Sequence, residues 1–171
     1  MNYQNITKDD MKNGDGLRVV LWVSGCDHHC KGCQNPVTWD ATDGLPFNDD
    51  AMIEIGNELS KDYVSGITFS GGDPLYYTNI KDIALLCVWV KLHFPEKTIW
   101  LYTGYTWEQI MDKKDNVPIT LILSCIDVMV DGRFEIDKLD VNYPWAGSWN
   151  QRVIDVQKSL KEGAVFRHES N

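Results

Sequence analysis

Apolar stretches of strand length alternate along the chain with segments whose apolar residues recur at helical spacing. Runs rich in β-branched and aromatic residues predict five strands, at 17–24, 66–69, 98–103, 127–130 and 152–156. The segment 119–125 is apolar throughout, so its periodicity does not decide between a buried helix and a strand. The chain therefore predicts a repeated order of strand and helix.

Three helices are predicted between these strands, each after a residue that can cap its first turn. Asn48 or Asp49 can cap the first helix, and Thr78 or Asn79 can cap the second. Thr106 can cap the third. The apolar faces of the three helices carry Met52, Ile55 and Leu59, then Ile83, Leu86 and Val90, then Ile110 and Met111.

Strands that alternate with helices predict an α/β fold with parallel pairing and right-handed crossovers. A complete eightfold barrel needs ~250 residues. About five units in 171 residues therefore predict a single-domain, partial and open parallel (β/α) barrel. We place this domain at residues 1–156 and treat 157–171 as a polar extension to which we assign no role.

Composition limits the classes of protein to which this chain can belong. The net charge of −9 argues against a nucleic-acid binder, whose affinity comes largely from contacts between basic side chains and phosphates. We find no signal peptide and no apolar run long enough to span a bilayer, so we expect a cytoplasmic protein without a membrane partner. Five cysteines, three of them close together, indicate a reduced metal site more than a disulfide framework.

Cys26, Cys30 and Cys33 are the three clustered cysteines, with Cys-x-x-x-Cys-x-x-Cys spacing directly after the first predicted strand. Structural zinc sites and ordinary electron-transfer clusters usually take four protein ligands, so three thiolates leave one position open. A Cys₃His zinc site completed by His28 or His29 is the alternative. Cys87 and Cys125 lie in apolar runs and are interpreted as buried small hydrophobes.

Polar or glycine-rich segments follow each of the first four predicted strands. The cysteine loop follows the first strand, and the others are followed by 70–74, by 103–105 and by 131–134. In parallel α/β folds, ligands bind at the carboxyl ends of the strands. We therefore expect these four segments to form one shared site.

The cysteine loop together with Gly71-Gly72-Asp73-Pro74 resembles the radical S-adenosylmethionine enzymes. Within that superfamily, the chain is similar to the activating proteins of anaerobic ribonucleoside-triphosphate reductases. This narrower resemblance extends from about residue 13 to 156 and rests on segments 13–18, 100–105, 130–134 and 147–152.

The resemblance implies a [4Fe-4S] cluster on Cys26, Cys30 and Cys33, with S-adenosylmethionine on the fourth iron. It implies that the cleaved cofactor yields a 5′-deoxyadenosyl radical, which takes hydrogen from a glycine of the reductase. It also implies a low-potential electron donor such as flavodoxin and, at Asp131, a possible monovalent cation. The implied cofactor-binding residues are Gly71, Gly72, Asp73, Pro74, Thr103, Gly104, Asp131, Ser148 and Asn150.

Other interpretations of the same motifs stay open. A radical enzyme that acts on a small molecule, such as a deazaguanine-type synthase, would share the cluster and the glycine turn. A non-enzymatic iron–sulfur or zinc module would need only the cysteines. The segment from Asn13 to Gly16 is either a simple turn or part of the cofactor or partner site.

Overall fold

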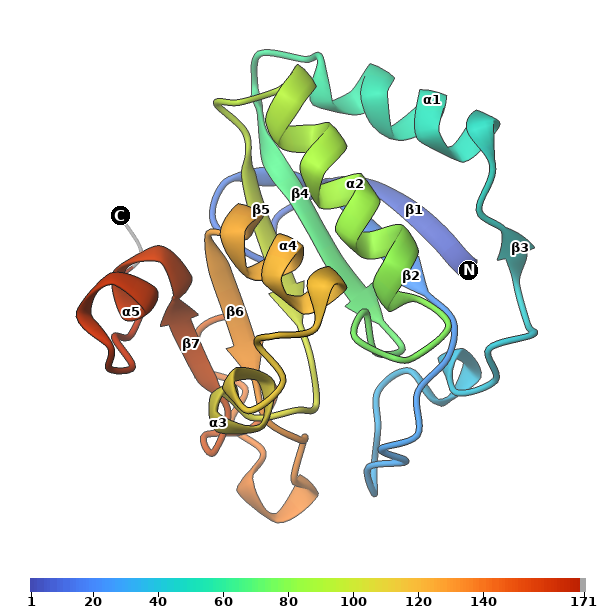
Figure 1. The fold of residues 1–171 in the computed structure, drawn as a ribbon. Helices are drawn as coiled ribbons and strands as arrows, with labels where there is room; N and C mark the ends of the chain where they lie inside the picture. Colours follow the sequence, from blue (N-terminus) through green and yellow to red (C-terminus); the bar gives the residue numbers. More distant parts are fainter. Residues whose placement is uncertain (170–171) are drawn as a thin grey trace.

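The computed structural model describes residues 1–169 as one sheet with helices packed on it (Figure 1). The described chain has seven strands, five α-helices and two short 3₁₀ helices. The strands are β1 Asn2–Asp10, β2 Leu17–Val23, β3 Leu45–Pro46, β4 Val64–Gly71, β5 Thr98–Tyr102, β6 Val128–Asp131 and β7 Arg152–Asp155. The helices are η1 Pro36–Thr38, α1 Asp49–Leu59, α2 Ile80–His93, α3 Trp107–Met111, α4 Val117–Cys125, η2 Ile136–Lys138 and α5 Val156–Glu162.

The seven strands form one open sheet in the order β3-β1-β2-β4-β5-β6-β7. The pairs β2–β4, β4–β5 and β5–β6 are parallel, as the alternation of strands and helices predicts. The prediction of parallel pairing is wrong for β7, which lies next to β6 in the sheet and runs antiparallel to it. The α/β class is confirmed, whereas the finer description as a partial barrel stays a prediction.

Strand β1 is absent from our sequence-based assignment, although it pairs antiparallel with both β2 and β3. It begins with polar residues, and only Tyr3 and Ile6 within it are buried. Because β1 has only the two-residue β3 beyond it in the sheet and buries few side chains, its apolar pattern is weak. Its place in the sheet comes from backbone hydrogen bonds to β2, which a pattern of side chains does not reveal.

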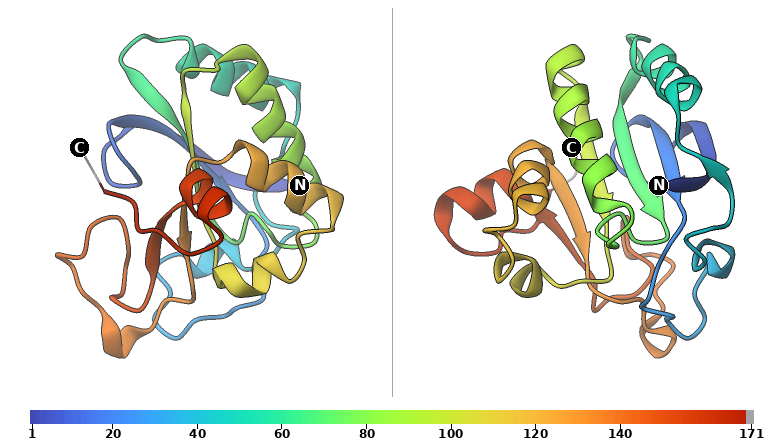
Figure 2. Two further views of the ribbon diagram at one scale, coloured as in Figure 1. Left: turned by 60° about the vertical axis from the view of Figure 1, so that its left-hand side comes forward. Right: turned by 45° about the vertical axis from the view of Figure 1, so that its right-hand side comes forward.

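Helices α1, α2 and α4 lie on the same face of the sheet (Figures 1 and 2). Alternate residues of the central strands point into this layer, among them Leu21, Phe69 and Leu101. They pack against the helical residues Ile55, Ile83, Leu86, Val90, Ile119 and Ile122. Segment 119–125 is therefore helical, with Ile119, Ile122 and Leu123 buried and Leu121 exposed.

The opposite face of the sheet carries the intervening residues of the same strands. Trp100, Val128, Val130 and Val153 form a smaller apolar cluster there. Arg18 on β2 is fully buried, and its guanidinium donates to Thr68 Oγ1 and to the Thr98 carbonyl. This arginine fills the end of the face that lies away from the cysteine loop.

The predicted helix caps differ in how they work. The Asn48 side chain accepts from the Ala51 amide, and Thr106 forms a capping box with Gln109. Asn79 holds the cap position of α2, but its side chain makes no cap hydrogen bond. Its amide instead donates to the carbonyls of Ser24 and Asp73, at 2.8 and 3.0 Å. Asn79 therefore connects α2 to the two loops that carry the predicted site.

The segment after Val156 packs on the sheet as far as it is described. Gln157 on α5 donates to the carbonyls of Leu123 and Ile126. His168 Nε2 lies 2.6 Å from Asp15 Oδ2, in the turn between β1 and β2. Residues 170 and 171 of the predicted extension lie outside the described residues.

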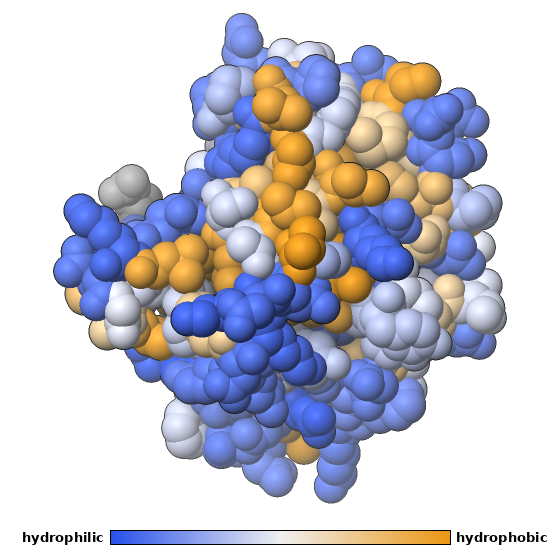
Figure 3. Space-filling view, in the orientation of Figure 1, coloured by the Kyte–Doolittle hydropathy of each residue, from blue (hydrophilic) through white to orange (hydrophobic). Residues whose placement is uncertain are grey.

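Exposed apolar side chains gather over α2 and α4 (Figure 3). They include Leu85 and Leu92 on α2 and Val117 and Leu121 on α4. Within residues 1–169, no helix has both the length and the apolar character that a bilayer crossing requires.

Candidate functional site

The loops that follow the parallel strands meet at one end of the sheet (Figure 1). They enclose a cavity of about 200 Å³ on the face opposite α1, α2 and α4. Its floor includes Trp22 and Tyr102 from the strands, and Asn13 reaches it from the β1–β2 turn. The cavity walls include Cys26, Cys30, Cys33, Gly71, Gly72, Asp73, Thr103, Gly104, Gly132 and Arg133. The four strand-end segments therefore form one site, as predicted.

The three cysteines of the loop after β2 all line this cavity and are half-buried free thiols. Burial raises the pKa of the Cys26 thiol to about 11, and burial also raises that of Cys30. The loop is held at its start, where Gly25 donates to the Thr38 carbonyl and Cys26 donates to that of Trp39. Three thiols therefore line a common cavity from a loop whose start is hydrogen-bonded to its end at Thr38 and Trp39.

The three thiols are not grouped as ligands of a single metal ion. Among residues 1–169, no three His, Cys, Asp or Glu side chains converge to hold one ion. A cubane cluster is different, because its cysteines bind different iron atoms. Nε2 of His28 is engaged with Asp73, so Nδ1 is the ring nitrogen left to bind a zinc ion. The donor set therefore fits a [4Fe-4S] cluster better than a Cys₃His zinc ion.

Gly71 and Gly72 bring the end of β4 against the cysteine loop. The Gly72 amide donates to the Val23 carbonyl, and the Asp73 amide donates to that of Gly25, both at 2.8 Å. A Cβ on Gly72 would lie 2.5 Å from the Gly25 carbonyl oxygen. Glycine is thus required at position 72 for the close approach of two backbone segments.

Asp73 is almost fully buried and lies at the centre of a hydrogen-bond network. Its carboxylate accepts from the Leu75 amide at 2.8 Å, the Gly104 amide at 3.0 Å and the Thr103 hydroxyl at 3.0 Å. His28 Nε2 contacts the same carboxylate at 2.7 Å. The Asp73 carboxylate therefore joins the strand-end loops to one another. Its predicted role, in contrast, is to bind the cofactor.

His28 connects the cysteine loop to this network. A carboxylate accepts only, so the hydrogen between the two side chains is carried by Nε2. The ring packs edge-on against Tyr105 at 4.6 Å, and a Cβ on Gly104 would lie 2.3 Å from it. Its Nδ1 is buried and has no hydrogen-bond partner among the described residues. From the sequence alone, His28 could be interpreted either as a loop residue or as the fourth ligand of a zinc ion.

The other predicted cofactor-binding residues do not line this cavity. These are Pro74, Asp131, Ser148 and Asn150. Ser148 accepts from the Glu135 amide through its hydroxyl, and Asn150 donates to the Arg133 carbonyl. They tie the loop before β7 to the loop after β6, whereas Asp131 pairs with Arg152.

Arg133 and Gln151 belong to the site without having been predicted. Both line the cavity. Arg133 is an exposed cation there, and Gln151 joins two loops by donating to the Gly132 carbonyl and accepting from the Gly147 amide. Arg133 lies in segment 130–134 and Gln151 in segment 147–152, and both segments carry the family resemblance, which was the available signal.

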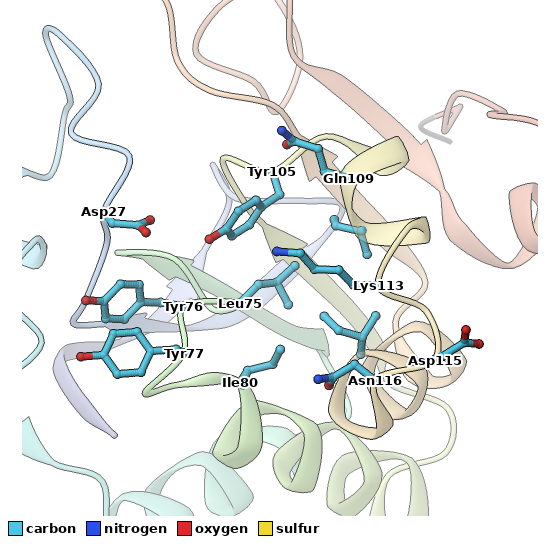
Figure 4. A pocket seen from close by; sticks show the side chains of 12 residues that line it. Asp27, Leu75, Tyr76, Tyr77, Ile80, Tyr105, Gln109, Lys113, Asp115 and Asn116 are labelled. Carbon is cyan, nitrogen blue, oxygen red and sulfur yellow. The ribbon is translucent and has the colours of Figure 1, made fainter.

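A second cavity of about 450 Å³ lies on the helical side of the cysteine loop (Figure 4). Tyr76 and Tyr77 lie side by side at its edge, with ring centroids 4.5 Å apart. Lys113 points toward the Tyr105 ring, 5.1 Å from its centroid. Because Tyr105 also packs against His28, these two side chains form a wall between the two cavities.

Comparison with known proteins shows to which family the chain is similar. Residues 12–154 match the family model of the 4Fe-4S single cluster domain. The chain is 45% identical over 153 residues to the anaerobic ribonucleoside-triphosphate reductase-activating protein of Enterobacteria phage T4, covering 90% of this chain and 93% of that one. Proteins of the same name from Pasteurella multocida and Escherichia coli K12 are 40% and 39% identical over 155 residues, covering 90% of this chain and 96% and 97% of theirs. The chain therefore belongs to the family of anaerobic ribonucleoside-triphosphate reductase-activating proteins.

Proposed function

We propose that this protein activates an anaerobic ribonucleoside-triphosphate reductase by reductive cleavage of S-adenosylmethionine at a [4Fe-4S] cluster. The resulting 5′-deoxyadenosyl radical would take a hydrogen atom from a glycine of the reductase. The observation that carries the proposal is the meeting of Cys26, Cys30 and Cys33 with the Gly71–Gly72 turn in one cavity. The names of the relatives supply the target enzyme.

Cys26, Cys30 and Cys33 would hold the cluster, which supplies a one-electron reductant and an iron with an open position. Cluster binding requires thiolates, so assembly would release the protons that the buried thiols of Cys26 and Cys30 hold at neutral pH. The anchored ends of the loop support this role, because Gly25 and Cys26 are fixed before any ligand binds.

The chain's own residues would orient the cofactor from two neighbouring strand ends. Gly71 and Gly72 line the cavity at the end of β4, and Thr103 and Gly104 line it at the end of β5. Arg133 is suited to bind the methionyl carboxylate because it brings a guanidinium to the cavity wall. Asp73 would act indirectly by fixing Thr103, Gly104 and His28 in place.

The partners follow from the same proposal. A glycine-bearing loop of the reductase would enter at the end of the sheet where the strand-end loops meet (Figure 1). A low-potential donor such as flavodoxin would supply the electron. Neither nucleic acid nor membrane is a proposed partner, and the cytoplasm is the proposed location.

Mixing the reconstituted protein with the reductase, S-adenosylmethionine and a reductant, without oxygen, tests the proposal. We expect 5′-deoxyadenosine, a doublet glycyl-radical resonance on the reductase and ribonucleotide reduction. A reductase with alanine in place of the radical-bearing glycine should give no such doublet. A Cys30→Ala activase provides the matched control on this chain and should give neither 5′-deoxyadenosine nor radical.

Two results would favour the other interpretations. Formation of 5′-deoxyadenosine without a protein radical, together with conversion of an added small metabolite, would point to a small-molecule radical enzyme. A reduced cluster that never cleaves S-adenosylmethionine would point to an electron-transfer module.

A further inference from the structure

Asp131 is the last residue of β6 and the candidate site for a monovalent cation. Its side chain is almost fully buried. It lies beside the cavity that holds the cysteines, because Gly104, Gly132 and Arg133 border both that cavity and the hollow lined by Asp131. A charge at Asp131 would therefore influence the loops that are proposed to hold the cofactor.

The partners of Asp131 are provided by the chain itself. Arg152, the first residue of β7, donates from Nε to Asp131 Oδ1 at 3.0 Å and from Nη2 to Oδ2. The Trp107 amide, at the start of α3, donates to Oδ2 at 2.7 Å. Both oxygens of the buried carboxylate therefore have partners, and one guanidinium contacts both of them.

Glu108 completes this arrangement from the first turn of α3. Its two oxygens accept from Arg152 Nη1 and Nη2, at 3.0 and 2.8 Å. Arg152 holds the pKa of the Glu108 carboxyl at about 2, and the two carboxylates hold the pKa of Arg152 above its usual range. A single positive charge is thus shared by two negative charges on β6 and α3.

A monovalent cation does not fit this arrangement. It would have to bind carboxylate oxygens that already accept from the guanidinium and from a backbone amide. It would also lie against the fixed positive charge of Arg152, at a cost that grows with burial. The expected cation and the observed arginine are therefore alternatives for the same place.

We propose that Arg152 is the built-in cation of this site, so that the protein binds no monovalent cation at Asp131. Arg152 neutralises Asp131, fixes the end of β7 against β6 and holds the turn at Gly132 and Arg133 beside the cofactor cavity. This inference concerns the surroundings of the proposed cofactor site and does not depend on the radical chemistry.

Thermal unfolding of the full chain without its cluster tests this inference. Melting temperatures are compared in sodium, potassium and tetramethylammonium chloride at equal ionic strength. The wild-type protein should melt at the same temperature in all three salts. Arg152→Ala should melt lower in tetramethylammonium, and sodium or potassium should raise its melting temperature in a saturable manner, because an ion that binds only the folded state stabilises it.

Variants with matched changes show whether any salt effect belongs to Asp131. In the double variant Asp131→Asn with Arg152→Ala, the specific salt effect should disappear. Arg167→Ala serves as the control for loss of an arginine, since Arg167 donates to the Tyr143 hydroxyl and should melt equally in the three salts. Arg152→Gln replaces Arg152→Ala if the latter does not fold, and it should show the same gain of a specific salt effect.

Sodium-23 line widths measured on the same proteins provide a second readout. We expect the wild type to match the Arg167→Ala control and the neutral Arg152 variants to show added broadening that potassium reverses. A saturable sodium or potassium effect in the wild type that Asp131→Asn removes would overturn the proposal. So would an Arg152→Gln protein that folds yet responds equally to all three salts.

Discussion

His28 Nε2 lies 2.7 Å from Asp73 Oδ2, which joins the cysteine loop after β2 to the turn after β4. The two side chains are 45 residues apart in the sequence. Thr103 and Gly104, from the end of β5, donate to the same carboxylate. Three consecutive strands of the sheet thus have their terminal loops fixed to one buried carboxylate, which gives the cavity its shape before any cofactor binds.

His28→Ala should destabilise the protein and loosen the cysteine loop. The substitution removes one donor from a buried carboxylate, which costs about 1–3 kcal/mol in the free energy of unfolding. Urea unfolding of the cluster-free protein measures this loss. His28→Gln, which can still donate to Asp73, should recover part of it, whereas His29→Ala is the matched control in the same loop and should have a smaller effect. Equal stability of His28→Ala and wild type would contradict the structural role given to this contact.

Gly104→Ala should also act through His28, because the added Cβ would lie 2.3 Å from the imidazole ring. Overpacking of this kind costs about 1–3 kcal/mol in unfolding free energy. In a His28→Ala background the obstacle is gone, so the two losses should not add. Gly56→Ala, inside α1, is the control and should cost less, because its added Cβ would lie 3.3 Å from its nearest neighbour, the Trp89 ring. Additive losses in the double variant would show that Gly104 is sensitive for another reason.

The five cysteines should divide into two groups after anaerobic reconstitution. Cys26→Ala, Cys30→Ala and Cys33→Ala should each lose the chemistry of a [4Fe-4S] cluster, because these side chains line the cavity. Cys87→Ala and Cys125→Ala should retain it, since both residues are buried in the apolar core. Mössbauer and paramagnetic resonance spectra, with and without S-adenosylmethionine, distinguish the groups. A normal cluster in Cys30→Ala would remove the basis of the assignment.

The site could be predicted from the sequence because its residues follow directly after parallel strands. The carboxyl ends of β2, β4 and β5 meet at one edge of the sheet, so Cys26, Gly72 and Thr103 come together once the strand order is right. Apolar runs of adequate length identify those strands. Local pattern was therefore sufficient for the fold class and for the position of the cavity.

Orientation of individual side chains could not be predicted in the same way. Asp73 turns inward because three donors from distant segments meet it, and Asp131 faces Arg152 because β7 runs antiparallel to β6. Neither relationship has a signal in the neighbouring residues of the chain. Antiparallel pairing of β7 places Arg152 directly opposite Asp131.

Glu108→Gln should lower stability at neutral pH and lose this effect in acid. The folded protein holds the pKa of Glu108 at about 2, below the ordinary value of 4.5, because Arg152 donates to both of its oxygens. A lowered folded pKa means that the stabilisation is fully present above about 4.5 and declines as the pH falls from 4.5 toward 2. Urea unfolding between pH 7 and about 3 should therefore show the wild type and Glu108→Gln converging once the pH falls below about 4.5. Glu162→Gln, at the exposed end of α5, controls for the loss of one surface negative charge and should show no comparable convergence. A difference between wild type and Glu108→Gln that stays constant with pH would mean that the pairing of Glu108 with Arg152 does not stabilise the folded chain.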